Sequence, residues 1–320
     1  MSIVAKQIHN EILKAENILI ISHQNPDGDT LSCACAMMQY LRSIDKNHTA
    51  FCATAINKNL AFLPHIEYFI IDPAIFQRAK FDLIIVFDSG DLLYAGVAEH
   101  LRDLPYTPTI VNIDHHTTNE MYGHFNLVVP EAASTTEILH RFFKINNLPI
   151  DKYIATSLLT GIITDTTHFT NPSTSANSLK IASELLRVGA NLNLIRGWTL
   201  KNKKIAALKI WGKVLSRLYK NEEYDMAITV LTRDDMAEFN LPDEEIDGLS
   251  NFLNHLGGTK IMLLLREKED GTIKASLRTT AADVDVSKIA LAFGGGGHAK
   301  AAGFTIKGKL VEENGGWRII

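Results

Sequence analysis

Cysteine is scarce in this chain of 320 residues, which contains three, at positions 33, 35 and 52. Their odd number and their spacing fit neither a CxxC metal site nor a ladder of disulfides. We therefore expect reduced thiols in a cytoplasmic protein.

Long apolar runs and strong net charge are also missing. No stretch approaches the roughly 20 apolar residues that would cross a bilayer, and no basic start leads into a long apolar run. We expect a cytoplasmic protein with no membrane partner.

A net charge of −4 gives no broad attraction for a polyanion, so long duplex nucleic acid is disfavoured, whereas a small anion in one pocket is allowed.

Short apolar runs that end in polar or acidic residues predict buried parallel strands. Three such runs are Ile18 to Ile21, Leu83 to Phe87 and Thr109 to Ile113. Helical spacing of apolar residues, or a capping signature, predicts helices over 3–13, 31–41, 135–143, 151–163 and 174–188. This order of elements is typical of a doubly wound, mostly parallel α/β sheet.

Composition changes after Gly189, where the last of these helices should end. The later chain predicts a smaller α/β domain, with a hairpin turn at Asp270-Gly271. Its expected strands are 225–231, 260–266, 273–279 and 301–306, and its expected helices are 242–256 and 286–293, followed by a loop of four glycines. We therefore expect domains at 1–189 and 220–320, joined by a linker and a connecting helix at 190–219.

Side chains that suit divalent cations follow the first predicted strand. The segment HQNPDGD places His23, Asp27 and Asp29 where a strand of an open α/β sheet ends, which is a usual position for a ligand. A cap on the next helix could use Asp29 or Thr30, but it would explain neither His23 nor Asp27.

Three later segments show the same kind of residues. Asp88 closes a buried apolar run, where a carboxylate is costly unless it caps a helix or meets a cation. Asp114-His115-His116 closes the next run, and a pair of surface histidines is the alternative interpretation. Asp165 lies among threonines, where a turn or cap residue is the ordinary interpretation. It is a candidate metal ligand only because the other three segments are present.

Together these segments predict a site for two divalent cations. Two adjacent cations can share one carboxylate, lower the pKa of bound water toward about 7, and bind a phosphoryl oxygen. Mixed carboxylate and imidazole ligands suit Mn²⁺ better than Mg²⁺, which prefers oxygen. We expect two divalent cations, with Mn²⁺ first and Mg²⁺, zinc or iron as alternatives.

The motifs HQNPDGD, FDSGD, NIDHH and TGIITDT resemble, in this order, those of the DHH phosphoesterase superfamily, whose name describes residues matching Asp114-His115-His116. ASLR at 275–278 and FGGGGH at 293–298 resemble its associated C-terminal domain. The resemblance covers nearly the whole chain and is nearest to bacterial 3′–5′ oligoribonucleases that also dephosphorylate 3′-phosphoadenosine 5′-phosphate. It implies a catalytic domain at 1–189 and a substrate-binding domain at 220–320, with the active site in the cleft between them.

The resemblance also implies roles for single residues. One cation would be held by His23, Asp27 and Asp88, and the other by Asp29, Asp88, His115 and Asp165. His116 would face the scissile phosphate, and Asp114 would orient its neighbours. Substrate phosphate or nucleotide would be held by Arg278, Gly295, Gly296, Gly297 and His298. On physical grounds, the glycines are expected to turn successive backbone N–H groups toward an anion, with a flexible linker as the alternative.

The substrates implied are short RNA or DNA oligonucleotides and small nucleotides. A phosphodiesterase for linear or cyclic diadenylate is the main alternative. A family II pyrophosphatase would carry an Arg-Lys-Lys cluster that this chain lacks, and RecJ-like exonucleases are longer. Outside enzymes, a catalytically silent nucleotide-binding protein should have lost a metal ligand, whereas all six are present. A homodimer is compatible with the sequence.

Overall fold

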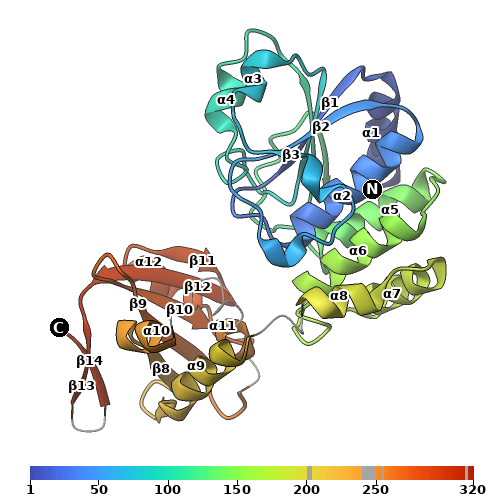
Figure 1. Cartoon of the computed structure of the whole chain (residues 1–320). Coiled ribbons are helices and arrows are strands. Elements are labelled where there is room, and N and C mark those ends of the chain that lie inside the picture. Colours follow the sequence, from blue (N-terminus) through green and yellow to red (C-terminus); the bar gives the residue numbers. More distant parts are fainter. Residues whose placement is uncertain (200–203, 240–248, 254–255, 314–315) are drawn as a thin grey trace. The chain divides into compact units, whose positions relative to one another are not determined.

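The computed structural model describes residues 1–199, 204–239, 249–253, 256–313 and 316–320. The chain divides into two units, Met1–Asn202 and Lys203–Ile320 (Figure 1). Among the described residues, no helix has both the length and the apolar character needed to cross a membrane.

Six strands in the first unit form one sheet in the order β3-β2-β1-β4-β5-β6, and every neighbouring pair is parallel. The strands are β1 (Asn17–Ser22), β2 (Asn47–Cys52), β3 (Phe69–Ile70), β4 (Leu83–Phe87), β5 (Thr109–Asp114) and β6 (Phe125–Val128). The three predicted strands are confirmed as β1, β4 and β5, which are adjacent in the sheet. The sequence did not predict β2, because its first half is not buried and carries polar side chains.

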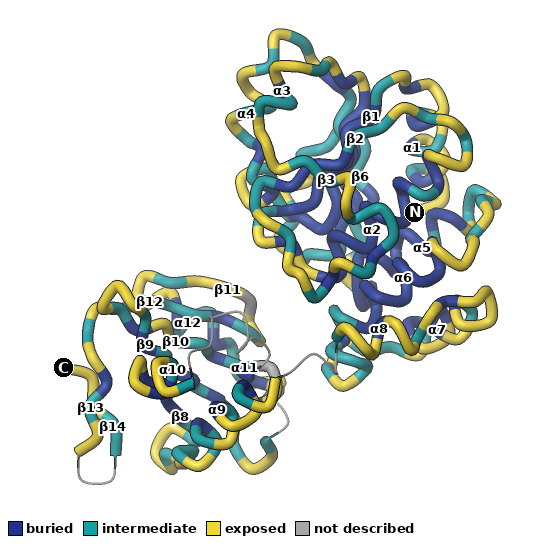
Figure 2. The backbone as a smooth tube through the Cα atoms, in the orientation of Figure 1, coloured by how far each residue is buried: buried dark blue, intermediate teal, exposed yellow. Residues whose placement is uncertain are grey.

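Helices cover both faces of this sheet (Figures 1 and 2). The larger core joins it to α1 (Ser2–Lys14), α2 (Gly28–Ser43), α5 (Thr135–Ile145), α6 (Lys152–Asp165) and α7 (Ala176–Val188), which confirm the five predicted helices. The other face packs against α3 (Ile75–Arg78) and α4 (Ala98–Arg102). The unit also contains 3₁₀ turns at Lys58–Leu60 and Ile66–Tyr68, and α8 (Leu192–Thr199) is its last described helix.

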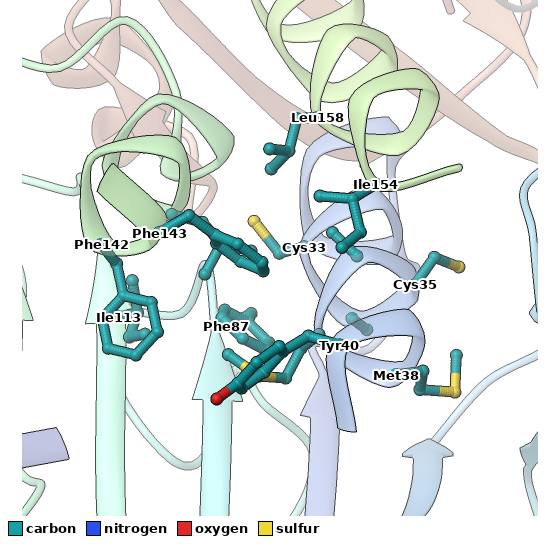
Figure 3. Packing of buried hydrophobic residues seen from close by; sticks show 14 of the residues in the cluster. Cys33, Cys35, Met38, Tyr40, Phe87, Ile113, Phe142, Phe143, Ile154 and Leu158 are labelled. Carbon is teal, nitrogen blue, oxygen red and sulfur yellow. The ribbon is translucent and has the colours of Figure 1, made fainter. Parts of the chain in front are cut away.

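Helix α2 is the centre of the larger core, since 13 of its 16 residues are buried. Figure 3 shows its side chains against those of α5 and α6, and the rings of Tyr40 and Phe143 meet edge to face with centroids 5.6 Å apart. Cys33, Cys35 and Cys52 are free and buried, which confirms the expected thiols. Because α2 is enclosed, polar residues in its first turn are withdrawn from solvent.

The second unit contains a mixed sheet in the order β11-β12-β10-β9-β8-β7. Its strands are β7 (Tyr219–Asn221), β8 (Met226–Leu231), β9 (Ile261–Glu267), β10 (Thr272–Arg278), β11 (Gly296–His298) and β12 (Ala301–Lys307), and a separate hairpin pairs β13 (Leu310–Glu313) with β14 (Gly316–Ile319). Antiparallel pairing of β9 with β10 confirms the turn at Asp270-Gly271.

The helices of this unit are α9 (Ile205–Ser216), α10 (Arg233–Phe239), α11 (Leu249–Phe252) and α12 (Val286–Ala292). Helix α12 confirms the helix predicted at 286–293. Of the helix predicted over 242–256, residues 249–252 form α11, and 242–248, 254 and 255 lie outside the described residues.

Candidate metal centre

The candidate ligands gather at the carboxyl ends of three adjacent strands. Ser22, Phe87 and Ile113 are in register across β1, β4 and β5. His23, Asp88 and the segment Asp114-His115-His116 therefore begin at one edge of the sheet. Two helices add carboxylates, because Asp27 is the N-cap of α2 and Asp165 is the last residue of α6.

Asp88 holds an unusual backbone conformation at this edge. Its φ angle is 59°, in the left-handed region that side chains disfavour, and its backbone N–H donates to the carbonyl of Ile113 at 3.0 Å. The residue is only 2% exposed. Strain of this kind persists where the surrounding structure fixes it, and it is common in functional sites.

The Asp88 carboxylate lies among three imidazoles. Its oxygens are 3.6 Å from Nε2 of His23, 3.6 Å from Nε2 of His115 and 3.8 Å from Nδ1 of His116. These distances are too long for hydrogen bonds. The two 3.6 Å distances, to Nε2 of His23 and of His115, match the spacing of two donor atoms that each lie about 2.0–2.2 Å from one ion.

The donor atoms form three overlapping groups, and within each group all the atoms lie within 4.8 Å of one another. The groups are His23, Asp27 and Asp88; Asp29, His115 and Asp165; and Asp88, His115 and His116. Asp88 and His115 each belong to two groups, so the structure brings all six predicted ligands into one connected cluster. His116, which the resemblance placed at the substrate, also belongs to this cluster.

The pKa shifts in the cluster show uncompensated negative charge. Burial and the nearby Asp88 raise the pKa of Asp29 to about 7. Burial, followed by the charge of Asp29, raises the pKa of Asp165 well above its usual value. Divalent cations would neutralise these carboxylates, so the cluster fits such ions in both donor chemistry and charge.

The histidines respond in the opposite direction. Burial acts to lower the pKa of His23, but the nearby carboxylates of Asp27 and Asp88, 3.8 and 3.6 Å from Nε2, raise it to about 11. Burial likewise opposes the effect of Asp88, Asp165 and Asp29, which together raise the pKa of His115 to about 9. Without metal, protons on these rings therefore supply part of the missing positive charge.

Backbone carbonyls fix which imidazole nitrogen faces the cluster. Nδ1 of His23 donates to the carbonyl of Gln24 at 2.9 Å, and Nδ1 of His115 donates to the carbonyl of Ala132 at 3.2 Å. Nε2 of each ring thus faces the carboxylates and can act as a metal ligand after deprotonation. The ring of Tyr94 stacks on His23 at a centroid distance of 4.9 Å.

Asp114 is buried beneath His116 and holds its ring. Its Oδ1 lies 2.7 Å from Nδ1 of His116, and its Oδ2 accepts a hydrogen bond from Asn119 at 2.6 Å. These bonds lower the pKa of Asp114 although burial opposes them. A charged carboxylate on Nδ1 orients the imidazole and leaves Nε2 as the ring's outward nitrogen.

Sequence reasoning was wrong about the cap of α2. Asp27, rather than Asp29 or Thr30, is the N-cap, and its Oδ1 accepts hydrogen bonds from their backbone N–H groups at 2.9 and 3.2 Å. The same carboxylate therefore begins the helix and belongs to the cluster.

A second contact was missed because it joins distant segments. The backbone N–H groups of Thr135 and Thr136 donate to the Asp29 carboxylate at 2.6 and 3.0 Å. The sequence signalled only the local cap, and that cap forms, since Ser134 accepts from the Glu137 backbone at 3.1 Å. No pattern in the sequence pairs position 29 with position 135.

The predicted substrate residues lie in the second unit. Arg278 on β10 and His298 on β11 are both in register with Ala301 of β12, on its two sides. Neighbouring strands are about 4.8 Å apart, so the two backbone positions are roughly 10 Å apart. Burial lowers the pKa of the Arg278 guanidinium.

The expected glycine loop needs correction. Gly296 and Gly297 belong to the strand β11, and the backbone N–H groups of Gly294 and Gly295 donate to carbonyls of α12 at 3.0 and 2.9 Å. The N–H of Gly295 is therefore not turned toward an anion. A Cβ at Gly295 would lie 2.2 Å from the carbonyl oxygen of Gly303, so close packing against β12 explains this glycine.

Comparison with known proteins gives matches in both units. Residues 17–162 match the family described as "DHH family, N-terminal domain", and residues 209–314 match the "DHHA1 domain". The chain is 30% identical over 305 residues to the "Bifunctional oligoribonuclease and PAP phosphatase NrnA" of Thermus thermophilus, an alignment that covers 95% of this chain and 89% of the relative.

Two further proteins are similar to all or part of this chain. A crystal structure from Bacteroides fragilis, titled as an exopolyphosphatase-related protein, superposes with a TM-score of 0.87 at 25% identity and covers 95% of this chain and 91% of its own. A Streptococcus thermophilus protein named "Probable manganese-dependent inorganic pyrophosphatase" is 28% identical over 182 residues, which are 55% of this chain and 56% of that protein.

Proposed function

This chain belongs to the DHH family of metal-dependent phosphoesterases, and from that premise we propose that it hydrolyses short oligoribonucleotides and converts 3′-phosphoadenosine 5′-phosphate to AMP and phosphate. The observation that carries the proposal is the single cluster of carboxylates and imidazoles, in which three donor groups overlap at Asp88 and His115. Similarity over almost the whole chain to an oligoribonuclease and PAP phosphatase supports the choice of substrate.

In this proposal, His23, Asp27 and Asp88 hold one divalent cation, and the other is held by Asp29, Asp88, His115 and Asp165. When bound, the cations supply water of lowered pKa and neutralise charge on phosphoryl oxygens. Mn²⁺ is proposed because two imidazoles, those of His23 and His115, accompany the carboxylates in these ligand sets. His116 would donate from Nε2 to the scissile phosphate, since Asp114 occupies Nδ1.

We also propose that the second unit binds the part of the substrate remote from the reacting phosphate. Arg278 would bind a substrate phosphate with a guanidinium suited to two parallel hydrogen bonds. The backbone of β11 from Gly296 to His298 lies on the opposite side of β12 from Arg278 and would contact another part of the same substrate. Gly295 would shape this segment by allowing close approach to β12.

A substrate panel with Mn²⁺ tests the proposal. It contains 3′-phosphoadenosine 5′-phosphate, RNA and DNA oligomers of graded length, linear and cyclic diadenylate, and pyrophosphate. We expect phosphate release from the first compound, nucleoside monophosphates from the shortest RNA oligomers, and slower cleavage of longer ones. Preference for a diadenylate or for pyrophosphate would assign a different substrate, and binding without hydrolysis would identify a silent nucleotide-binding protein.

A variant links the activity to the cluster. Asp88→Asn should lower kcat at least about 100-fold, because even groups that only support metal ligands are worth about 10–100-fold. Asp103→Asn, at an exposed aspartate in the same unit, should retain full activity. Equal activities for the two variants would show that hydrolysis comes from a contaminating enzyme.

A further inference from the structure

The first turn of α5 lies directly against two carboxylates of the metal cluster. The hydroxyl of Thr135 donates to Oδ1 of Asp88 at 2.8 Å, and its backbone N–H donates to Oδ2 of Asp29 at 2.6 Å. Thr136 donates to Oδ1 of Asp29 from its backbone at 3.0 Å and from its hydroxyl at 2.6 Å. Both threonines are fully buried, so these bonds form without competition from water.

Three consecutive N–H groups of this turn donate to side-chain oxygens. The first N–H groups of a helix have no partner within the helix. Here Asp29 accepts from Thr135 and Thr136, and the Ser134 side chain accepts from Glu137. Because the N-terminal end of a helix carries partial positive charge, this arrangement also favours the ionised form of Asp29 against its burial.

Thr135 differs from its neighbours because it contacts both carboxylates. The imidazoles around Asp88 are 3.6 Å or more from its oxygens, whereas the Thr135 hydroxyl is within hydrogen-bond distance. Threonine is branched at Cβ, so its χ1 rotamer is restricted and its hydroxyl has a defined direction. The orientation of Asp88 is therefore tied to the helix that holds Asp29.

Helix α6 packs directly against Thr136 and Asp29. A Cβ at Gly161 would lie 2.3 Å from Cγ2 of Thr136 and 2.7 Å from Oδ1 of Asp29. Helices α2, α5 and α6 thus meet at this point, with no space for the Asp29 carboxylate to move toward α6.

We infer that Thr135 is a positioning residue for the metal pair: its hydroxyl sets the orientation of Asp88 relative to Asp29, and α5 thereby sets the spacing of the two cations. The inference rests on the proposed function to the extent that the cluster binds two cations. It adds a residue outside the proposed ligand sets, which would act through the two carboxylates that it hydrogen-bonds.

Two substitutions at this position separate hydrogen bonding from packing. Thr135→Val keeps the branched shape and the backbone N–H but removes the hydroxyl, whereas Thr135→Ser keeps the hydroxyl and removes the methyl group. Thr160→Val is the matched control, because the buried Thr160 hydroxyl donates to the Thr156 carbonyl within α6 at 2.8 Å and meets no carboxylate of the cluster.

Calorimetric titration with Mn²⁺ gives the stoichiometry and affinity, and electron paramagnetic resonance reports the coupling of two neighbouring Mn²⁺ ions. We expect Thr135→Val to weaken binding of the second Mn²⁺ about 10–100-fold, to reduce the spin-coupled signal, and to lower kcat more than it raises KM. Thr135→Ser and Thr160→Val should bind both ions within a few-fold of the wild type.

Several results would overturn the inference. The first is a Thr135→Val variant that binds Mn²⁺ with wild-type affinity and spin coupling. The second is a loss of Mn²⁺ affinity in Thr135→Ser as large as that in Thr135→Val, because it would show that packing of the methyl group, rather than the hydroxyl, supports the site. If Thr135→Val does not fold, Thr135→Ala removes the hydroxyl without steric demand and takes its place. Failure of the wild-type protein to bind two Mn²⁺ ions would instead contradict the proposed function.

Discussion

Asp88 combines a left-handed backbone, almost complete burial and three neighbouring imidazoles. A non-glycine residue in that region costs on the order of 1–3 kcal/mol. Residue types alone predicted that Asp88 needs a partner, because a carboxylate after a buried strand is otherwise costly. They could not predict the contact with Thr135, which depends on where α5 begins in space rather than on any local pattern.

The charge of the cluster predicts how stability varies with pH in metal-free protein. The pKa of His23 is raised to about 11 and that of His115 to about 9, from 6.5. A group with a raised pKa adds stability that is complete below its unfolded-state pKa and is lost as pH rises toward its folded-state pKa. Burial lowers the pKa of His140 to about 4, so this ring is neutral at pH 7 and above and does not change the pH dependence of stability there.

We therefore expect the melting temperature of chelator-treated protein to fall by at least about 3 °C from pH 7 to pH 8.5. Mn²⁺ should raise the melting temperature more at pH 8.5 than at pH 7, because protons and metal compete for the same imidazoles. Thermal unfolding at both pH values, with chelator or with Mn²⁺, measures this. A melting temperature that rises with pH in chelator would contradict the charge balance described here.

Asp114 gives a prediction for the ring that it holds. Asp114→Asn keeps the size of the side chain but removes the charge beside Nδ1 of His116. We expect kcat to fall about 10–100-fold, as for other groups that orient a functional imidazole. Mn²⁺ affinity should change much less, because Asp114 is absent from the three donor groups. Steady-state kinetics and calorimetric titration test this, and equal losses in kcat and Mn²⁺ affinity would assign Asp114 to metal binding.

At the level of elements, the sequence predicted the strands that are buried and apolar. Strands β4 and β5 were predicted because they are apolar runs that end in acids, and β4 is buried along its whole length. Strand β11 was expected to be a loop, since glycines have no side chains to show a strand pattern. Its pairing with β12 depends on the backbone, where Gly297 at φ 137° lies so close that a Cβ would be 2.6 Å from the Ala301 carbonyl oxygen.

The contact of α6 with α2 and α5 predicts opposite effects at two helical glycines. Gly161→Ala would place a methyl group 2.3 Å from Thr136 and 2.7 Å from Asp29, so it should lower the free energy of unfolding by about 1–3 kcal/mol and weaken Mn²⁺ binding. Gly212→Ala in α9 has no atom within 4 Å of the new Cβ.

Gly212→Ala should therefore be neutral or stabilise by up to about 1 kcal/mol through helix propensity. Denaturant unfolding in chelator and calorimetric titration with Mn²⁺ compare the pair. Equal stability and equal Mn²⁺ affinity in the two variants would show that α6 can move away from Asp29, and that the three helices do not fix its carboxylate.

Over the whole molecule, the candidate ligands and the candidate substrate residues belong to different units. Every donor in the metal cluster lies between His23 and Asp165, within the unit Met1–Asn202, whereas Arg278 and β11 belong to Lys203–Ile320. The family models match the two parts separately. Changes in the second unit should therefore alter substrate binding without altering metal binding.

Arg278 tests this separation. Arg278→Ala should raise KM for 3′-phosphoadenosine 5′-phosphate roughly 10–100-fold, because a hydrogen bond to a charged group contributes about 1.5–3 kcal/mol. Arg278→Lys should recover only part of the affinity, since lysine keeps the charge but loses the paired geometry of the guanidinium. Mn²⁺ stoichiometry and affinity should equal those of the wild type in both variants.

Arg233→Ala is the control for loss of positive charge, because Arg233 is exposed in the same unit, on α10. The substrate pair that decides the question is 3′-phosphoadenosine 5′-phosphate and 3′-AMP, which lacks the second phosphate. If Arg278 binds the 5′-phosphate, its removal should raise KM for the bisphosphate far more than for 3′-AMP. An equal rise for both compounds would place Arg278 against the base or the sugar, and an unchanged KM would remove it from the substrate site.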